Sequence, residues 1–268
     1  MTLTLEDIQN NPAEKKIAID QVGVTDLRYP IVILDRQNEK QQTVAHMTAS
    51  VSLPQHFKGT HMSRFIEVLN QHRGEVTMRT LPEILNHLKV RLEAESARLE
   101  LQFPYFLERS APVSQAKGIV DYDCWFVGEV SGNTCDFIFK VRVPVATLCP
   151  CSKAISDYGA HNQRGHIDIS VRTGRTKSGE MDFVWIEELI DIAEKSASGP
   201  VYSLLKREDE RHVTMHAFDN PAFVEDMVRN VAASLLEEPR VVWFQVRAEN
   251  HESIHNHNAF AFIERDKR

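Results

Sequence analysis

Two cysteines and two histidines lie close together between Thr147 and His166, where the chain reads TLCPCSKAISDYGAHNQRGH. Cys149 and Cys151 flank a proline, and His161 follows twelve residues after Cys149. A thiolate and an imidazole together form a borderline-soft site, which Zn²⁺ and similar divalent ions prefer. The spacing is not that of a zinc finger, but it suits a loop that leaves a strand and doubles back. The segment therefore predicts a metal-binding loop, with a surface loop carrying two incidental thiols as the alternative.

Residues 206 to 229, KREDERHVTMHAFDNPAFVEDMVR, form a second polar segment with groups that could take part in chemistry. Glu210 precedes His212, and Glu225 falls in the first turn of a helix that we expect Asn220 to cap. A carboxylate at that place can simply stabilise the helix dipole. Glu225 lies at the edge of the apolar stripe, however, which also allows a partly buried role.

Residues 249 to 260, ENHESIHNHNAF, contain three of the twelve histidines of the chain. His255 and His257 share one face if this segment is a strand. A histidine between two strands is well placed to donate or accept a proton, because its pKa lies near neutrality. We take His255 as the preferred catalytic histidine. A histidine-rich surface hairpin is the alternative.

The overall composition narrows the class of protein. The 268 residues are 42% apolar and 26% charged, which is ordinary for a globular protein. A net charge of −7 argues against a nucleic-acid-binding surface. Residues 1 to 18 show no apolar signal-peptide core, and no apolar run reaches the length of a membrane span. We therefore expect a cytoplasmic protein with reduced thiols, of which Cys124 and Cys135 are buried and inert.

Alternating and helical patterns predict the elements that position these groups. Two helices are expected after Thr60 and after Thr80, the latter with Glu83 at capping-box spacing. Two more are expected at residues 184–198 and after Asn220. The expected strands cover residues 31–34, 43–53, 99–103, 122–130, 134–145, 166–172, 241–248 and 258–264. Helices that follow antiparallel hairpins indicate an α+β fold with helices on one face of a sheet.

Several of these segments together resemble the type IB GTP cyclohydrolase I family over nearly the whole chain. They are VRVPVATLCPCSKAISDYGAHNQRGH, GTHMSRF, LKREDE, NPAFVEDMVR and SIHNHNAFA. The resemblance implies a tunnelling fold of two tandem modules, each an antiparallel four-stranded sheet with two helices on one face. We expect a flexible segment at 1–18, a first module at 19–148 and a second at 149–268 that carries most of the metal site. It also implies a homotetramer with active sites at subunit interfaces.

The family's reaction is the conversion of GTP and water into formate and 7,8-dihydroneopterin triphosphate, the first step towards tetrahydrofolate. The resemblance implies a divalent metal, Zn or Mn with Fe as a further candidate, held by Cys149, His161 and Glu210. It implies that Glu225 binds the guanine ring and that His255 acts in catalysis. Three protein ligands would leave a position open for water, whose pKa the metal lowers.

Each remaining group has an expected role. His255 would protonate the ring nitrogen as water adds at C8 of guanine. The carboxylate of Glu225 would accept hydrogen bonds from the N–H edge of guanine and reject adenine. The triphosphate needs cations, for which the candidates are Lys153, Arg164, Lys206 and Arg211.

Three other functions stay open on the sequence alone. A relative of the same fold makes a cyclic phosphate from GTP, and the metal loop does not separate it from the cyclohydrolase. Another relative reduces a nitrile with a cysteine nucleophile and a nicotinamide cofactor, and the chain contains no glycine-rich dinucleotide motif. A non-catalytic module in which Cys149 and Cys151 both hold a structural ion is the third, and it would unfold on chelation.

Overall fold

The computed structural model describes residues 8–72, 80–177 and 181–268. Within them the strands form an antiparallel sheet in the order β1-β2-β3-β4-β5-β6-β8-β9, and the short strand β7 pairs with β5. The chain divides into two compact units, one of Met1–Phe103 with Trp125–Ile138 and one of Pro104–Cys124 with Phe139–Arg268. Three long strands contribute to both units: β3 (Ser96–Ser110), β4 (Lys117–Ser131) and β5 (Thr134–Leu148).

The first unit is built on a long hairpin of β1 (Ile19–Asp35) and β2 (Glu39–Leu53). Asp35 fixes the turn, because its Oδ1 accepts hydrogen bonds from the backbone N–H groups of Gln37 and Asn38, both at 2.8 Å. Two helices follow, α1 (Met62–Gln71) and α2 (Leu81–Arg91), and they contact each other. Their buried stripes consist of Phe65, Val68, Leu69, Leu81, Ile84, Leu85 and Leu88.

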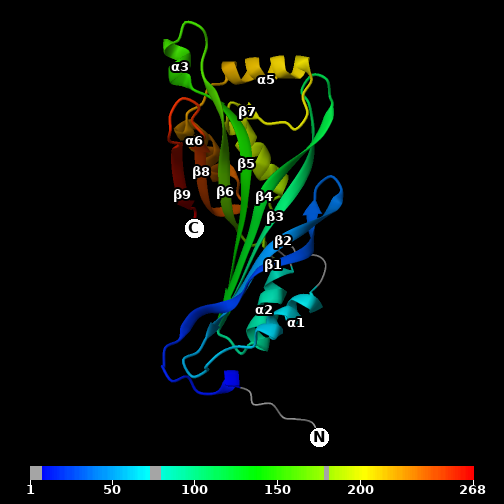
Figure 1. The fold of residues 1–268 in the computed structure, drawn as a ribbon, viewed down its shortest axis with the longest axis vertical. Helices are drawn as coiled ribbons and strands as arrows, with labels where there is room; N and C mark the ends of the chain where they lie inside the picture. Colours follow the sequence, from blue (N-terminus) through cyan, green and yellow to red (C-terminus); the bar gives the residue numbers. More distant parts are fainter. Residues whose placement is uncertain (1–7, 73–79, 178–180) are drawn as a thin grey trace. The chain divides into compact units, whose positions relative to one another are not determined.

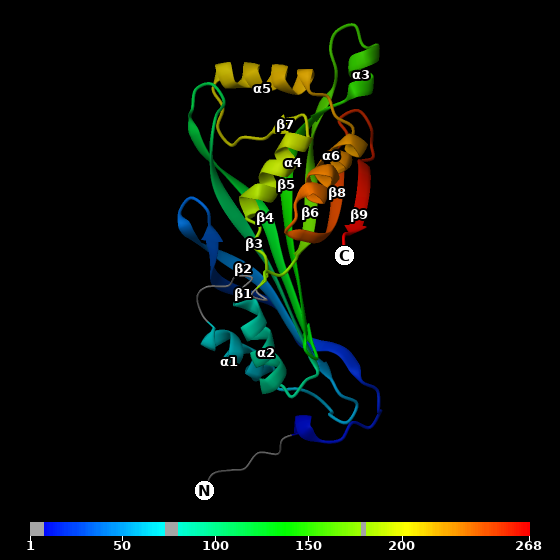
Figure 2. The ribbon, with the colours of Figure 1, turned by 180° about the vertical axis from the view of Figure 1, so that it is seen from behind.

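The second unit carries all the predicted site residues. After β5 come α3 (Pro150–Ile155), β6 (Asn162–Thr173), α4 (Ile186–Ser196) and β7 (Gly199–Pro200). They are followed by α5 (Arg207–Asp219), α6 (Val224–Glu237), β8 (Val241–Asn250) and β9 (Ala259–Asp266). Helices α4 and α6 lie side by side and contact the strands, whereas α5 lies across the strand ends near α3 (Figures 1 and 2).

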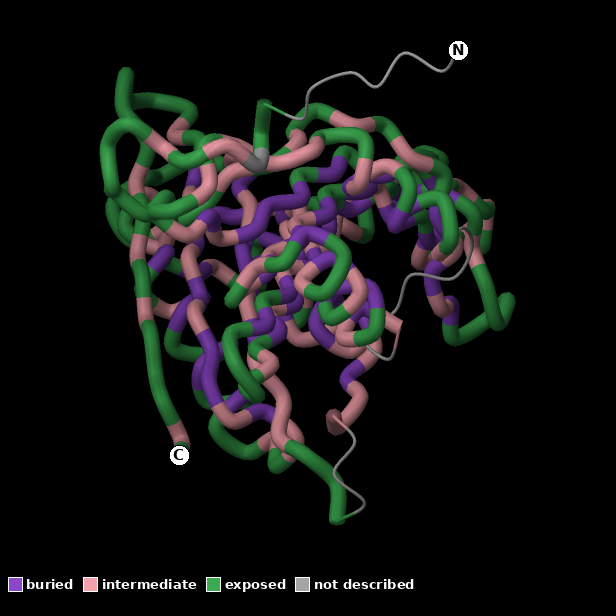
Figure 3. The backbone as a smooth tube through the Cα atoms, turned by 90° about the horizontal axis from the view of Figure 1, so that it is seen from below, coloured by how far each residue is buried: buried purple, intermediate pink, exposed green. Residues whose placement is uncertain are grey.

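The two faces of this part of the sheet differ in chemistry. Side chains alternate along a strand, and buried positions alternate with partly exposed ones along β5 and most of β6. Figure 3 shows buried and intermediate stretches following one another along the backbone. Val141, Val143 and Ile167 are fully buried on one face. The other face is charged, since Arg142 and Asp168 are cross-strand partners and Arg142 Nε donates to Asp168 Oδ1 at 2.8 Å. The helices therefore cover the apolar face and leave a polar one.

Several expected helix boundaries were wrong. Helix α1 begins after His61 rather than Thr60, and the side chain of Thr80 makes no cap hydrogen bond although it occupies the N-cap of α2. Asn220 ends α5, while α6 begins after Phe223, whose N–H donates to the side chain of Asp226 at 3.2 Å. These caps depend on the local backbone path, which the residue types do not determine.

The order of two strands, two helices and two strands occurs twice. It is formed first by β1 to β4 with α1 and α2, and again by β5, β6, β8 and β9 with α4 and α6. By this order the first repeat ends at the turn after Ser131, before the expected boundary at 148, while α3 and α5 are additions to the second. In the expected flexible segment, residues 1–7 lie outside the described residues, and Ile8–Asn10 form a 3₁₀ helix.

No helix in the described part of the chain combines the length and the apolar character needed to cross a membrane.

Candidate active site

Cys149 and His161 lie opposite each other where β5 ends and β6 begins. The N–H of Cys149 donates to the carbonyl of His161 at 3.2 Å, which continues the pairing of Leu148 with Asn162. Between them the chain forms α3 and then turns back at Gly159, whose φ of +128° is one that other residues rarely adopt. The expected loop that doubles back is therefore present, with a short helix inside it.

The ring of His161 is held on one side. Its Nδ1 lies 2.9 Å from Oε1 of Gln163 and 3.1 Å from Oγ of Ser253. Hydrogen bonds of this kind fix the orientation of metal-ligating histidines and leave the other ring nitrogen for the ion. Together with the nearby thiol of Cys149, the imidazole has the donor chemistry and the support that suit a divalent metal.

The two thiols of the loop differ in setting. Cys149 is half-buried at the N-cap of α3, where its sulfur accepts a hydrogen bond from the N–H of Ser152 at 3.5 Å. Cys151 is exposed on α3. Of the other two cysteines, Cys124 is buried as expected, and burial raises the pKa of its thiol. Cys135 is only partly buried, contrary to expectation, because it lies near the β4–β5 turn.

Glu210 does not join this pair. It is exposed near the beginning of α5, whereas Phe218, at the other end of α5, contacts Lys153 of α3. The two positions are roughly 12 Å apart along the helix axis. Across residues 8–72, 80–177 and 181–268, no three His, Cys, Asp or Glu side chains are gathered as ligands of one ion. The chain thus brings together two of the three predicted metal ligands.

Glu225 and His255 come from segments that meet the same end of the strands. The N–H of Ala222 donates to the carbonyl of Leu148 at 3.2 Å, so the chain entering α6 lies beside the start of the CPC segment. Glu225 lies in the first turn of α6, as expected, but its side chain is exposed and not partly buried. His255 lies in the loop after β8, not in a strand, and its ring stacks on that of His257 with centroids 5.1 Å apart.

The four candidate cations lie in different settings. The ammonium of Lys153 donates to the carbonyl of Phe218 and lies 4.2 Å from the centroid of its ring, so it is engaged within the protein. Lys206 and Arg211 are exposed at the beginning of α5. Arg164 lines two cavities found among the described residues, and the other three side chains line neither of them.

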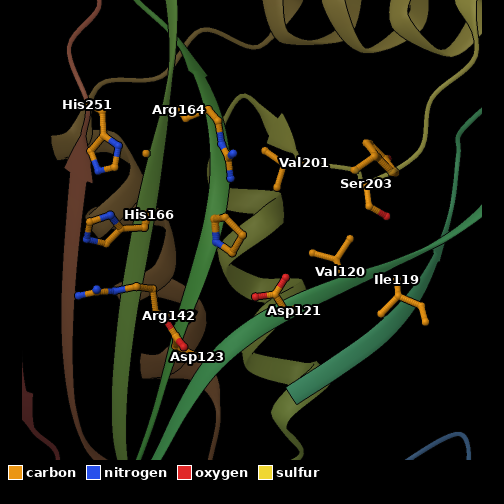
Figure 4. Close-up of a pocket in the computed structure, with 13 residues that line it drawn as sticks. Ile119, Val120, Asp121, Asp123, Arg142, Arg164, His166, Val201, Ser203 and His251 are labelled. Atoms are coloured by element: carbon orange, nitrogen blue, oxygen red, sulfur yellow. The ribbon is translucent and has the colours of Figure 1, made fainter. Parts of the chain in front are cut away.

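The first cavity, of about 450 Å³, lies between α5, the ends of β5 and β6, and the segment that follows β7. The second cavity, of about 530 Å³, lies next to it, and the two share the lining residues Arg164, Val201 and Tyr202. Figure 4 shows the second cavity, with Asp121 and Asp123 on β4 and His166 on β6.

Apart from Arg164, sequence reasoning gave no role to the charged side chains and histidines that line the second cavity, which are Asp121, Asp123, Arg142, His166 and His251. The rings of His166 and His251 meet edge to face at 5.4 Å, and burial, together with the charge of Arg142, lowers the pKa of His166. The alternation of β6 places His166 on the polar face of the sheet, but the nearness of His251 depends on the pairing of β6 with β8.

Comparison with known proteins identifies the family. The family model described as "Type I GTP cyclohydrolase folE2" matches residues 5–261. A GTP cyclohydrolase FolE2 of Nitrosococcus oceani is 51% identical over 263 residues, covering 98% of this chain and 96% of that protein. One of Syntrophus aciditrophicus is 53% identical, covering 97% of this chain and 99% of its own.

Solved structures support the fold alone. A uricase from Bacillus fastidious superposes with a TM-score of 0.59 at 10% identity, over 95% of this chain and 94% of its own. A uricase from Arthrobacter globiformis gives a TM-score of 0.54, also at 10% identity, over 92% and 93% of the two chains. Uricases have a tunnelling fold, so the expected α+β tunnelling fold is confirmed. Because the family model matches residues 5–261 and the relatives are about half identical over almost the whole chain, the chain belongs to the type I GTP cyclohydrolase FolE2 family.

Proposed function

We propose that this protein is a GTP cyclohydrolase I that converts GTP and water into formate and 7,8-dihydroneopterin triphosphate in folate biosynthesis. The observation that carries the proposal is the Cys149–His161 pair, joined through the backbone and supported at Nδ1 of the imidazole. Relatives named GTP cyclohydrolase FolE2, about half identical over almost the whole chain, support the same activity.

Cys149 and His161 would hold a divalent ion, Zn or Mn with Fe as a further candidate, and Glu210 stays the predicted third ligand. The chemistry that such an ion supplies is a bound water acidic enough to attack near neutral pH. Gln163 and Ser253 contact Nδ1 of His161, which would leave Nε2 of the imidazole for the ion.

His255 would donate a proton to the imidazole-ring nitrogen of guanine as the bond between water and C8 forms. It would then accept and donate protons during ring opening. Glu225 would accept hydrogen bonds from N1–H and the 2-amino group. The loop of His255 is close to the metal pair, since Ser253 of that loop contacts His161. The start of α6 lies beside Leu148, which favours the role of Glu225.

The active unit would be a homotetramer in a reducing cytoplasm, with active sites at subunit interfaces. The exposure of Glu210 and Glu225 supports this assembly, because a metal ligand and a base-binding carboxylate are expected to be covered in the working enzyme. All four cysteines are free, as a reducing compartment requires.

The test is GTP turnover by metal-stripped protein with Mn²⁺ or Zn²⁺ added back, following formate and the fluorescent oxidised pterin. Pterin formation should depend on metal and fall at least about a hundredfold in Cys149→Ala, because even the partners of metal ligands contribute ten- to a hundredfold. Cys151→Ala, which alters an exposed thiol of the same loop, is the matched control. Folded protein that consumes no GTP with any divalent ion would exclude this function.

Two further readouts separate the alternatives. The mass of the product distinguishes dihydroneopterin triphosphate from a cyclic phosphate. Circular dichroism after chelation separates an enzyme from a metal-stabilised module, because the enzyme should keep its fold and lose only its activity.

A further inference from the structure

The loop of residues 251–258 joins β8 to β9 and contains the predicted proton donor. It forms neither helix nor strand, and most of its side chains are exposed. At its start, the N–H of His251 donates to the carbonyl of Arg164 on β6 at 2.9 Å. At its end, the side-chain amide of Asn258 donates to Oε1 of Glu249 on β8 at 3.0 Å. Both ends of an exposed loop are therefore tied to regular strands.

Glu249 is itself held in place by a second side chain. Its Oε2 accepts a hydrogen bond from the guanidinium of Arg247 at 2.9 Å. Arg247 lies over the ring of Phe260, 4.2 Å from its centroid, and Phe260 is the β9 partner of Glu249. The hydrogen bonds from Arg247 and Asn258 hold the pKa of Glu249 below its ordinary value, so the group is a carboxylate at neutral pH. Arg247, Glu249 and Asn258 form a clamp at the end of the loop.

The same loop reaches the predicted metal pair. Oγ of Ser253 lies 3.1 Å from Nδ1 of His161, and His255 follows two residues later. Along the chain, His255 thus lies between the contact to His161 and the clamp at Asn258. Its ring stacks on that of His257, which belongs to the same loop and so does not tie the ring to a strand. The place of His255 relative to His161 depends on how the loop is held.

Proton transfer is sensitive to that place. A proton donor must lie within hydrogen-bond reach of its acceptor, and a misplacement of about 1 Å can cost about a hundredfold in rate. An exposed loop without secondary structure of its own opens easily when a tying contact is lost. A charge-assisted hydrogen bond such as that of Glu249 is stronger than one between neutral groups.

We propose that Glu249 is a positioning residue, which through Asn258 holds the loop of His255 beside Cys149 and His161. The inference rests on the proposed function, since His255 has its catalytic role in that reaction. Sequence reasoning gave Glu249 and Asn258 no role, because their contact depends on how β8 pairs with β9.

The experiment is a double-mutant cycle on GTP turnover at saturating metal. Glu249→Ala and Asn258→Ala should each lower kcat about tenfold, because each removes one side of a charge-assisted hydrogen bond. The double variant should be no slower than the slower single variant, since both changes break the same contact. KM for GTP should change less than about threefold, because a proton donor acts in the transition state. Glu249→Gln keeps an acceptor oxygen and should recover most of the loss.

The matched control is Glu264→Ala. Glu264 belongs to the same hairpin and accepts a hydrogen bond from the indole N–H of Trp243 at 2.9 Å, but it lies nearer the end of the hairpin away from the loop. This variant should keep kcat within about twofold of wild type, because it removes a carboxylate contact without releasing the loop.

Hydrogen exchange reads the loop without turnover. Mass spectrometry of the metal-loaded protein, over the peptide of residues 250–260, should show exchange about tenfold faster in Asn258→Ala and unchanged in Glu264→Ala. Asn258 is exposed, so its truncation should leave the fold intact.

The outcomes are distinct. Unchanged kcat in both Glu249→Ala and Asn258→Ala would overturn the proposal, as would additive losses in the double variant or unchanged exchange of the loop in Asn258→Ala. Wild-type protein that makes no pterin, with faster exchange of the loop in Asn258→Ala, would refute the cyclohydrolase activity and leave the clamp in place.

Discussion

At the scale of single residues, the side chains that support His161 are expected to contribute to metal binding in addition to the ligand itself. Gln163 comes from β6 and Ser253 from the loop after β8, so the imidazole is fixed by two segments far apart in the sequence. Replacing both with alanine should lower metal affinity about ten- to a hundredfold, because the ring would turn freely. Competition with a fluorescent chelator measures this affinity. Ser156→Ala, an exposed serine at the end of α3 between Cys149 and His161, is the control. An unchanged affinity in the double variant would contradict the role assigned to these contacts.

His255 and His257 provide a second comparison between single residues, because both are exposed in one loop and their rings stack. If His255 is the proton donor, His255→Ala should lower kcat by about 10² to 10⁴. His257→Ala should lower it far less, since a stacked neighbour only limits the motion of the ring. Steady-state kinetics with GTP separate the two. The reverse order of effects would transfer the catalytic role to His257.

At the scale of elements, α5 depends on one buried carboxylate. Asp209 is fully buried, and its oxygens accept hydrogen bonds from the backbone of Val113, Ser114 and Lys206 and from the hydroxyl of Ser114. Burial alone would raise the pKa of Asp209, but these hydrogen bonds outweigh it and hold the pKa well below its ordinary value. The carboxylate caps α5 and ties it to the β3–β4 turn.

This arrangement predicts how stability depends on pH. The folded protein binds the proton of Asp209 less tightly than the unfolded chain, so the stabilisation is present above the ordinary aspartate pKa and is lost as the pH falls below about 4. The Tm of wild type should therefore decline more steeply between pH 6 and pH 3 than that of Asp209→Asn. Scanning calorimetry measures the difference. Glu208→Gln, an exposed neighbour, should follow wild type, and parallel curves for wild type and Asp209→Asn would refute the assignment.

At the scale of the whole molecule, β9 is an edge strand of the described sheet, and we expect a second subunit to bind along it. Within the described chain β9 pairs only with β8, and it exposes Phe260 and Phe262. If the tetramer forms through this strand, Phe262→Glu should shift the protein from tetramers to dimers or monomers. The rate of pterin formation should fall as the tetramer is lost. Sedimentation velocity measures the assembly. Leu236→Glu on α6 replaces a side chain of similar exposure and should leave the assembly intact. A wild-type monomer with full activity would contradict the proposal that an active tetramer forms through β9.

Most of the fold could be predicted from local patterns. Buried and more exposed side chains alternate along the long strands, and the run of Val141, Arg142 and Val143 shows this period of two in the sequence. Helix α5 was not foreseen, because its apolar residues form no stripe and because Asp209 ties it to Val113 and Ser114, which lie 96 and 95 positions away. Asn220 was mistaken for an N-cap because the same residue type also suits the end of a helix.

The sequence by itself determined the family and the alternating strands. It also determined that Cys149 and His161 lie close together, because a short loop between paired strands brings residues near in sequence together. Tertiary structure alone decided which of the four cations lines the described cavities, which histidines line one of these cavities with it, and what fixes α5. Arg164, Tyr202 and His216 belong to different elements, and their nearness depends on strand register and on how α5 crosses the strand ends. These are long-range contacts, and no spacing along the chain encodes them.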